Sequence, residues 1–188
     1  MRVILASKSP RRKELLGRLF SDFEIIVSDA DESLPDGKTP AECAEEIALR
    51  KGRAVALATG DDALVVSSDT MVELDGVILG KPESVADAHR MLSLLSGRVH
   101  NVHTGVAVHY RGRVFSGADT TRVEFRQLCA DEIDAYIATG EPMDKAGAYG
   151  IQGEGGRLVV GYDGDYDTVV GLSLRLTERL ISEAVGNE

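Results

Sequence analysis

The sequence predicts an α/β protein, because apolar segments typical of strands alternate with amphipathic segments typical of helices. The chain begins with an apolar segment at 3–5, continues with a helical pattern that reaches Leu19, and returns to strand-like residues at 23–27. Apolar residues 64–66 predict a further buried strand. Residues 99–125 alternate between apolar and charged side chains, as antiparallel hairpins with one exposed face do.

The chain has 188 residues, of which 43% are hydrophobic and 28% are charged. This length suffices for one well-buried domain and is short for two independent ones, so we expect a single domain over residues 1–188. No apolar segment is long enough to span a bilayer, and the start MRVILASKSP lacks the apolar region of a secretory signal. The composition therefore predicts a cytoplasmic protein without a membrane partner.

The formal net charge of -10 argues against a nucleic-acid polymer as partner, because duplex binding depends on a basic surface. A small anion held by a local basic cluster is compatible with this charge. Cys43 and Cys129 match no metal or redox spacing, and His100 and His103 would point to opposite faces of a strand. We therefore expect two reduced thiols and no zinc site.

The first helix carries two arginines where cations are unfavourable. Ser9 can cap this helix and Pro10 can occupy its first position, which places Arg11 and Arg12 at the positive end of the helix dipole. A bound anion would compensate for this arrangement. The hydroxyls of Ser7 and Ser9, with the free backbone N–H groups, would help to hold a phosphate. The alternative is a pair of exposed arginines with no ligand.

A second helix begins at residues 39–42, Thr-Pro-Ala-Glu, which form a capping box with proline at the first helical position. The pattern predicts that this helix ends at Gly60. Lys51 falls in the middle of the apolar stripe, with Gly52 beside it. A lysine on that face either extends outward to solvent or projects into a cleft where an anion pairs with its charge, and we favour the cleft. The apolar residues of the stripe are Ala44, Ile47, Ala48, Val55 and Ala58.

Residues 64–82 bring an acid and a base into one short span. The apolar strand is expected to end at residues 67–68 and to deliver Asp69 to its carboxyl end, where ligands bind in open α/β sheets. Residues 75–76, Asp-Gly, predict a tight hairpin turn that returns Lys81 towards Asp69. The alternative is an exposed loop aspartate and a solvated lysine.

A cluster of acidic residues at 28–32 follows the second strand and ends at Glu32. Such a cluster could hold a divalent metal, and it could equally be a solvated loop. Its position at a strand end, like that expected for Asp69, favours the metal site.

The rest of the chain predicts three more helices and two more strands, each bounded by turn residues. The helices are expected at 85–95, 131–138 and 174–185, and the strands at 158–160 and 168–170. Residues 144–156 are dense in glycine but match neither the nucleotide P-loop nor the dinucleotide fingerprint. Glycines there allow the backbone to approach a ligand, and Gln152 offers an amide with a donor end and an acceptor end.

Basic and acidic side chains thus occur together in the predicted site. Basic groups alone would suit a passive phosphate-binding protein, whereas carboxylates beside them suit metal-assisted attack of water on a phosphate. The residues themselves therefore predict a metal-dependent enzyme that acts on a small phosphorylated compound. The members of this set are Arg11, Arg12, Lys51, Lys81, Glu32 and Asp69.

Five segments, in this order, resemble the motifs of the Maf family of nucleoside triphosphate pyrophosphatases, and the resemblance covers almost the whole chain. The segments are S-x-S-P-R-R at 7–12, S-D-T at 68–70, G-K-P at 80–82, S-G-R-x-H at 96–100 with Thr104 and Gly105 following, and D-K-A-G-A-Y-G-I-Q-G at 144–153. The resemblance implies a mixed α/β fold related to inosine triphosphate pyrophosphatases. In that fold a long twisted mixed sheet with flanking helices forms two lobes around a central cleft.

The resemblance also implies a reaction and roles for single residues. A nucleoside triphosphate is cleaved between its α and β phosphates, with magnesium or manganese as the expected divalent cation. Asp69 matches the position of the proton acceptor, and Glu32 matches an acidic position that helps to hold the metal, so both are expected as metal ligands. Arg12, Lys51 and Lys81 match phosphate-binding positions, and Lys81 is also counted with the catalytic group.

Arg11, Thr70 and Gln152 resemble the specificity residues of the branch that acts on dTTP and UTP. A glutamine amide can pair with the imide edge of thymine or uracil, and a buried unpaired amide would penalise other bases by about 1–3 kcal/mol. Because the amide can rotate to suit cytosine, CTP stays open as a substrate. Ser68 and Gly52 depart from the family pattern, where alanine is usual.

The family resemblance also bears on biological role. It implies a homodimer and is compatible with house-cleaning of modified nucleotides and with a link to cell-division arrest. The sequence also leaves modified pyrimidine triphosphates open as substrates. The competing function is a regulatory nucleotide-binding protein of septum formation that does not turn its ligand over. Retention of both Asp69 and Lys81 argues against a pure binder, which gains little from a water-activating acid.

Overall fold

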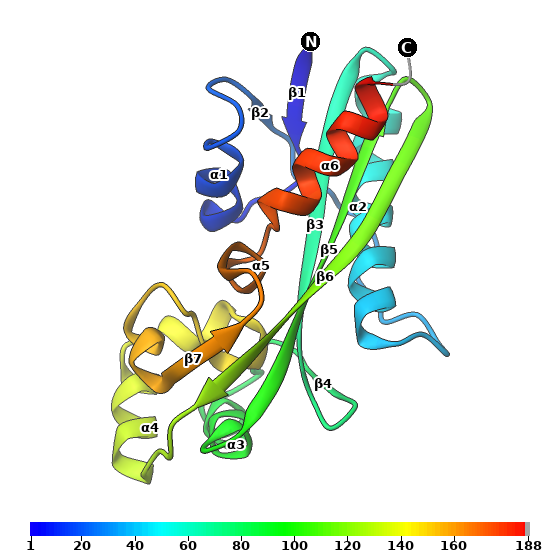
Figure 1. Ribbon diagram of the computed structural model, residues 1–188. Helices are drawn as coiled ribbons and strands as arrows, with labels where there is room; N and C mark the ends of the chain where they lie inside the picture. The colour runs from blue at the N-terminus through cyan, green and yellow to red at the C-terminus, as the bar shows by residue number, and fades with distance from the viewer. Residues whose placement is uncertain (187–188) are drawn as a thin grey trace. The chain divides into compact units, whose positions relative to one another are not determined.

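The computed structural model describes residues 1–186, and helices alternate with strands as the sequence predicts (Figure 1). The strands are β1 (Arg2–Leu5), β2 (Glu24–Ile25), β3 (Ala63–Leu74), β4 (Val77–Leu79), β5 (Val99–Tyr110), β6 (Arg113–Phe125) and β7 (Val159–Asp163). The α-helices are α1 (Pro10–Leu16), α2 (Pro40–Thr59), α3 (Val85–Leu95), α4 (Ala130–Ala138), α5 (Tyr166–Val170) and α6 (Leu174–Val185). The short 3-10 helices η1 (Glu141–Asp144), η2 (Ala146–Ala148) and η3 (Glu154–Leu158) lie in and beside the glycine-rich segment.

Within residues 1–186, seven strands form one sheet in the order β2-β1-β3-β5-β6-β7, with β4 paired to β3. β1 runs parallel to β2 and β3, whereas β4 is antiparallel to β3 and β7 is antiparallel to β6. The sheet is therefore mixed, as predicted. The described chain divides into two compact units, the first comprising residues 1–70, 104–119 and 171–186 and the second residues 71–103 and 120–170.

The first unit begins with the predicted strand-helix-strand arrangement. β1 lies between β2 and β3, so that Leu5 pairs with Ile25 on one side and with Val66 on the other. β2 is shorter than the expected strand at 23–27. It forms the edge of the sheet and both of its residues are exposed, so few contacts are available to extend it.

The two helices of the first unit that carry site residues begin where the sequence predicts. Ser9 is the N-cap of α1, and its hydroxyl accepts the N–H of Arg12 at 3.4 Å. The predicted capping box opens α2, which ends at Gly60 with a positive φ of 78°. Ala58 is exposed, contrary to the predicted stripe, because the buried face of α2 ends one turn earlier at Val55.

β3 is longer than the sequence suggests. The expected end at Ser67 and Ser68 is wrong, since the strand continues through Asp69. Both serines are fully buried, and their hydroxyls donate to backbone carbonyls, Ser67 to Ala48 at 2.7 Å and Ser68 to Gly171 at 2.9 Å. Small buried hydroxyls with satisfied hydrogen bonds do not end a strand. Asp69 therefore lies inside a strand and not in a loop.

The second unit contains the predicted hairpin. β3 and β4 pair with Val72 opposite Leu79, and the turn residues Asp75 and Gly76 have φ values of 52° and 81°. These positive values are those that a two-residue hairpin turn needs. The helices α3 and α4 cover a large apolar cluster in this unit, in which the ring of Phe125 packs against neighbouring aromatic side chains.

The strand expected at 158–160 is found as β7, but the strand expected at 168–170 is wrong, because these residues lie in α5. The carboxylate of Asp165 explains the helix. It accepts the backbone N–H of Asp167 at 3.3 Å and the hydroxyl of Thr168 at 3.2 Å, as a helix-capping side chain does.

β5 is buried along nearly its whole length, so the expectation of one exposed face is wrong for this strand. β5 lies between β3 and β6 in the order of the sheet, and α2 packs closely against it, since a Cβ atom at Gly105 would overlap the backbone of Ala44. His100 and His103 have separate partners: Nε2 of His100 bonds to the hydroxyl of Tyr149 and Nδ1 of His103 to that of Thr120, both at 2.8 Å.

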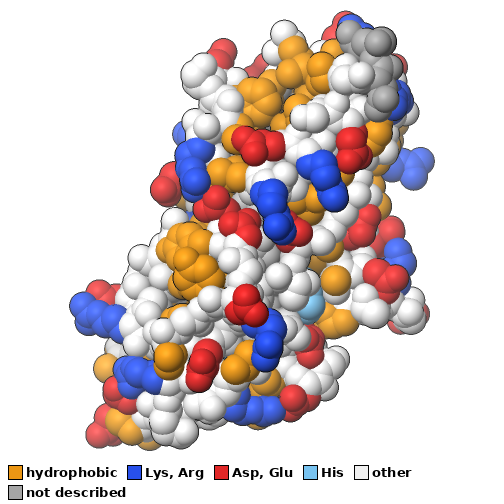
Figure 2. All heavy atoms as spheres, viewed as in Figure 1, with side chains coloured by type: hydrophobic (Ala, Val, Ile, Leu, Met, Phe, Trp, Pro, Cys, Tyr) orange, Lys and Arg blue, Asp and Glu red, His pale blue; other side chains and the backbone are white. Residues whose placement is uncertain are grey.

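Two surface properties bear on possible partners. None of the described helices combines the length and apolar character that crossing a bilayer requires. On the face drawn in Figure 2, Lys and Arg side chains are interspersed with Asp and Glu side chains and form no continuous basic field.

Candidate active site

A buried lysine joins two of the predicted acids. The ammonium nitrogen Nζ of Lys51 lies 2.6 Å from Oδ1 of Asp69 and 3.2 Å from Oε1 of Glu32. The Lys51 side chain is 9% exposed and that of Asp69 15%, whereas that of Glu32 is 58% exposed. One ammonium thus lies between a sheltered carboxylate and a solvent-facing one. The lysine is paired within the first unit and does not extend to solvent.

Close packing behind Lys51 fixes its position. A Cβ atom at Gly52 would lie 2.5 Å from Oγ of Ser67 and 2.6 Å from the ring of His109, so only glycine lets α2 approach β3 and β5 this closely. The hydroxyl of Ser67 also bonds to the carbonyl of Ala48, about one helical turn before Lys51. The backbone that carries the lysine is therefore held against the strand that carries Asp69.

The start of α1 brings Arg12 to the same strand. Its Nε donates to the carbonyl oxygen of Gly171 at 2.9 Å, and its Nη2 donates to Oγ1 of Thr70 at 3.3 Å. Its Nη1 lies 3.5 Å from Oγ of Ser7, which also accepts the N–H of Ser9 at 3.2 Å. Arg12 is thus held by hydroxyls and a backbone carbonyl, beside the residue that follows Asp69.

The electrostatics of the first unit favour an anionic ligand. Arg12 is partly buried, and this desolvation lowers the pKa of its guanidinium; the charge of Asp69 opposes the effect and the charge of Arg11 adds to it. A guanidinium stays protonated even so. The three cations Arg11, Arg12 and Lys51 therefore face the two carboxylates Asp69 and Glu32, and a local excess of positive charge attracts anions.

Two contacts of this site were not predicted from the sequence. The carbonyl oxygen of Gly171 accepts hydrogen bonds from Nε of Arg12 and Oγ of Ser68, both at 2.9 Å. The hydroxyls of Thr70 and Thr104 lie 2.9 Å apart and share a hydrogen bond. Neither Gly171 nor Thr104 carries a local signal of these contacts, because their partners lie far away in the chain.

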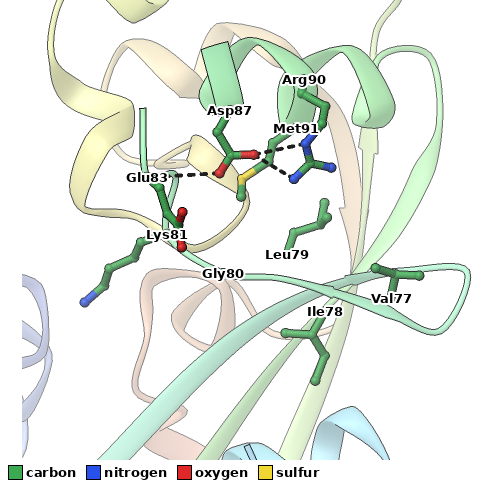
Figure 3. A pocket seen from close by; sticks show the side chains of 9 residues that line it. All are labelled: Val77, Ile78, Leu79, Gly80, Lys81, Glu83, Asp87, Arg90 and Met91. Carbon is green, nitrogen blue, oxygen red and sulfur yellow. Dashed lines mark hydrogen bonds and ion pairs between the residues drawn. The ribbon is translucent and has the colours of Figure 1, made fainter. Parts of the chain in front are cut away.

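Lys81 and Gln152 belong to the second unit, and both are exposed. Lys81 follows β4 at the rim of a surface hollow lined by β4 and the start of α3. Figure 3 shows its side chain extending away from the ion pair between Asp87 and Arg90. Gln152 lies in the loop between η2 and η3. The remaining predicted site residues lie in the first unit: Ser7, Ser9, Arg11, Arg12, Glu32, Lys51, Asp69 and Thr70.

The acidic residues of the first unit fit a metal ion in part. Within residues 1–186, no group of three or more Asp, Glu, His or Cys side chains is placed to hold a metal by itself. Asp69 and Glu32 nevertheless converge, since both contact the ammonium of Lys51. Mg²⁺ is commonly bound through one or two carboxylates together with water and substrate phosphates. The pair therefore fits a metal that arrives with a phosphorylated substrate.

The model of the family described as Maf-like protein matches residues 2–184 of this chain. The chain belongs to the Maf family. Over 183 residues it is 53% identical to the dTTP/UTP pyrophosphatase of Moorella thermoacetica, covering 96% of this chain and 94% of the relative. Over 178 residues it is 48% identical to the dTTP/UTP pyrophosphatase of Thermococcus gammatolerans, covering 95% and 94%. The family match spans both units, and a single Maf-like domain over the chain stays a prediction.

Among solved structures, the Ham1 protein of Staphylococcus aureus resembles the Maf-family chain with a TM-score of 0.53. The match covers 100% of this chain and 95% of that one at 18% sequence identity, which supports a shared fold and nothing further. The predicted fold class, a mixed α/β sheet with flanking helices, is therefore confirmed.

Proposed function

We propose that this Maf-family chain hydrolyses dTTP and UTP to the nucleoside monophosphate and pyrophosphate. Relatives at 53% and 48% identity over nearly the whole chain carry the name dTTP/UTP pyrophosphatase. The observation that carries the proposal is the ammonium of Lys51 between Asp69 and Glu32. In this arrangement, two acids that can activate water lie beside a cation that can hold phosphate.

Asp69 is the proposed general base. It lies inside β3, and its Oδ1 is held by Lys51 at 2.6 Å, so its orientation is defined before substrate binds. From this position the carboxylate would take the proton of the water that attacks the phosphorus atom. General-base catalysis of this kind contributes about 10²- to 10⁴-fold to a rate.

The basic residues are assigned to the triphosphate. Arg12 presents a fork of N–H donors, with the hydroxyls of Ser7 and Ser9 beside it, and Lys51 supplies a second sheltered charge. Guanidinium groups and hydroxyls at a helix start are suited to phosphate oxygens. We also assign Lys81 to the catalytic group, on its match to the family motif Gly-Lys-Pro at 80–82.

The proposed metal ligands are Asp69 and Glu32, and the proposed ion is magnesium or manganese. When bound, such an ion neutralises phosphate charge and favours ionisation of a bound water. Glu32 is 58% exposed, so its carboxylate can turn from Lys51 towards an ion without unpacking the core. Asp69 keeps its hydrogen bond to Lys51 and stays in the strand.

Arg11, Thr70 and Gln152 are the proposed specificity residues. The exposed amide of Gln152 would pair with the imide edge of thymine or uracil, and Thr70 would keep its hydrogen bond to Arg12. A cytoplasmic location, a homodimer, the absence of a nucleic-acid or membrane partner, hydrolysis of modified pyrimidine triphosphates and a link to cell division remain predictions.

The test is pyrophosphate release from dTTP, UTP, CTP, dCTP, GTP and 7-methyl-GTP, with Mg²⁺ or Mn²⁺ and again with EDTA. We expect the fastest release from dTTP and UTP, and no release with EDTA. If no triphosphate is cleaved while nucleotide still binds, the enzymatic proposal fails and a regulatory nucleotide-binding protein is favoured. Equal rates with 7-methyl-GTP would overturn the substrate assignment and leave the reaction in place.

A further inference from the structure

Gln152 is carried by a loop whose backbone is held at several points within the second unit. We call residues 150–155 the Gln152 loop. The Gln152 side chain is exposed, but Ile151 beside it packs against the large apolar cluster of this unit. The Gln152 amide, which is proposed to bind the base, thus extends from a backbone that is anchored by apolar packing.

Polar anchors reach the same loop from α4 and η1. Oε2 of Glu141 accepts the backbone N–H of Glu154 at 2.9 Å, and its Oε1 accepts that of Gly155 at 3.2 Å. The hydroxyl of Tyr136 donates to Oε1 of Glu141 at 2.9 Å and accepts the N–H of Gly150 at 3.2 Å. One carboxylate and one phenol therefore bind both ends of the Gln152 loop.

The glycines of the loop permit this approach. A Cβ atom at Gly153 would overlap the carboxylate of Glu141, and one at Gly155 would lie 2.5 Å from the hydroxyl of Tyr136. Any larger residue at these positions would push the loop off its two anchors. Gly153 and Gly155 thus allow the backbone of the loop to contact the side chains of Glu141 and Tyr136.

The charge states of the anchors suit their hydrogen bonds. Burial works to raise the pKa of Glu141, but the N–H groups of Glu154 and Gly155 and the hydroxyl of Tyr136 outweigh it and lower that pKa. Burial, with the nearby carboxylate of Glu141, raises the pKa of Tyr136. At neutral pH Glu141 is therefore an ionised acceptor and Tyr136 a neutral donor.

We propose that Glu141, assisted by Tyr136, is a positioning residue for base recognition, which holds the Gln152 loop so that the amide meets the imide edge of thymine or uracil. The inference rests on the proposed function and deepens it, because it assigns base selectivity to a residue that does not touch the base. An ordered loop binds the base without the cost of ordering it, and it limits the positions from which the Gln152 amide reaches a base, although the amide itself can still rotate.

Two variants and one matched control test this role. Glu141→Gln replaces one acceptor oxygen by an NH₂ group that faces backbone N–H donors, and Tyr136→Phe removes the hydroxyl between Glu141 and Gly150. The control is Glu154→Gln, which removes the same charge from the loop itself. The Glu154 side chain is exposed and pairs with Arg157 at 2.8 Å, and the variant keeps the backbone N–H that Glu141 accepts.

Kinetics separate positioning from a general loss of structure. For Glu141→Gln and Tyr136→Phe we expect KM for dTTP and UTP to rise by about tenfold and kcat to stay within about threefold. Discrimination of UTP against GTP should fall by about fivefold, because a loosened loop admits a larger base. Glu154→Gln should match the wild type. If the variants lose kcat equally for every nucleotide with KM unchanged, they contain less folded enzyme and the positioning role is overturned.

A second measurement does not depend on turnover. In the absence of nucleotide, amide hydrogen exchange at Gly150, Glu154 and Gly155 should be at least about tenfold faster in Glu141→Gln than in the wild type or in Glu154→Gln. Unchanged exchange at these amides would overturn the proposal whatever the kinetics. If the wild type cleaves no triphosphate, the proposed function fails separately, and exchange together with titration of a non-hydrolysable UTP analogue still decides whether Glu141 positions the loop.

Discussion

The ammonium of Lys51 and the carboxylate of Asp69 lie 2.6 Å apart, although one residue belongs to α2 and the other to β3. Both side chains are largely sheltered from solvent, at 9% and 15% exposure. Removing either side chain would leave the charge of the other unpaired, in surroundings that solvate it poorly. The pair is therefore the rigid part of the proposed site, and the exposed Glu32 is its adjustable part.

Asp69→Asn should lower the rate of pyrophosphate release from dTTP by about 10²- to 10⁴-fold, because the amide cannot accept a proton from water. The amide oxygen can still accept the hydrogen bond of Lys51. At saturating Mg²⁺, which offsets the loss of one proposed metal ligand, the affinity for a non-hydrolysable dTTP analogue should therefore change little. Asp62→Asn, at an exposed residue near the start of β3, is the control. A variant that retains a tenth or more of the wild-type rate would refute the role of Asp69 as general base.

Lys51→Met keeps the length of the side chain and removes its charge. We expect kcat/KM for dTTP to fall by at least about 100-fold, since Asp69 loses its partner and the phosphate loses a sheltered cation. Lys38→Met removes a surface lysine that pairs with Glu46 at 2.9 Å, and it should leave the kinetics unchanged. Circular dichroism checks that both variants fold. Equal kinetics for the two variants would contradict the assignment.

Glu32→Gln should raise the Mg²⁺ concentration needed for half-maximal activity by about tenfold, because a neutral amide is a poorer ligand for a hard cation. The measurement is a titration of activity with Mg²⁺ at saturating dTTP. Asp29→Asn alters another exposed acid of the same loop and serves as the control. An identical Mg²⁺ requirement in Glu32→Gln and the wild type would remove Glu32 from the metal site.

Gly52→Ala should lower the free energy of unfolding by about 1–3 kcal/mol, because the added methyl group collides with Ser67 and His109. Adding His109→Ala in the same chain should recover a large part of this loss, which urea unfolding of the single and double variants measures. Gly161→Ala has open space around the new Cβ atom and should stay within about 0.5 kcal/mol of the wild type. Additive effects of the two substitutions would show that the predicted collision is absent.

Stability should fall as the pH is lowered from about 6.5 to 4. Burial lowers the pKa of His100 to about 4, with Glu73 opposing the shift, whereas a histidine in the unfolded chain has a pKa of about 6.5. Between these values the unfolded state binds a proton that the folded state does not, so the free energy of unfolding falls with falling pH, by at most about 3 kcal/mol. Burial lowers the pKa of His103 and His109 as well, which acts in the same direction.

Urea unfolding at pH 7.5 and pH 5 tests this contribution. The double variant His100→Phe with Tyr149→Phe replaces the hydrogen-bonded pair by two rings, and it should lose less stability between the two pH values than the wild type. His89→Asn, at a histidine on the surface of α3, should behave as the wild type does. A double variant with the same pH dependence as the wild type would exclude His100 as a source of the effect.

Local signals predicted the features that depend on a few neighbouring residues. The caps at Ser9 and Thr39 and the turn at Asp75 and Gly76 are found as expected, because helix starts and two-residue turns are decided by side chains within one turn of the chain. Helical spacing placed Lys51 on the buried face of α2 for the same reason, since the period of a helix links residues three and four apart.

Tertiary structure alone decided the features whose partners are far away in the chain. β3 continues through Ser68 because its hydroxyl meets the carbonyl of Gly171, 103 residues later, and Arg12 is held by the same carbonyl across 159 residues. Judged from its neighbours alone, a polar serine suggests the end of a strand. Only a hydrogen-bond acceptor far away in the chain makes its burial favourable. The sequence by itself therefore determined which residues are proposed for the chemistry, and the long-range contacts determined that Asp69 lies inside a strand, fixed by Lys51.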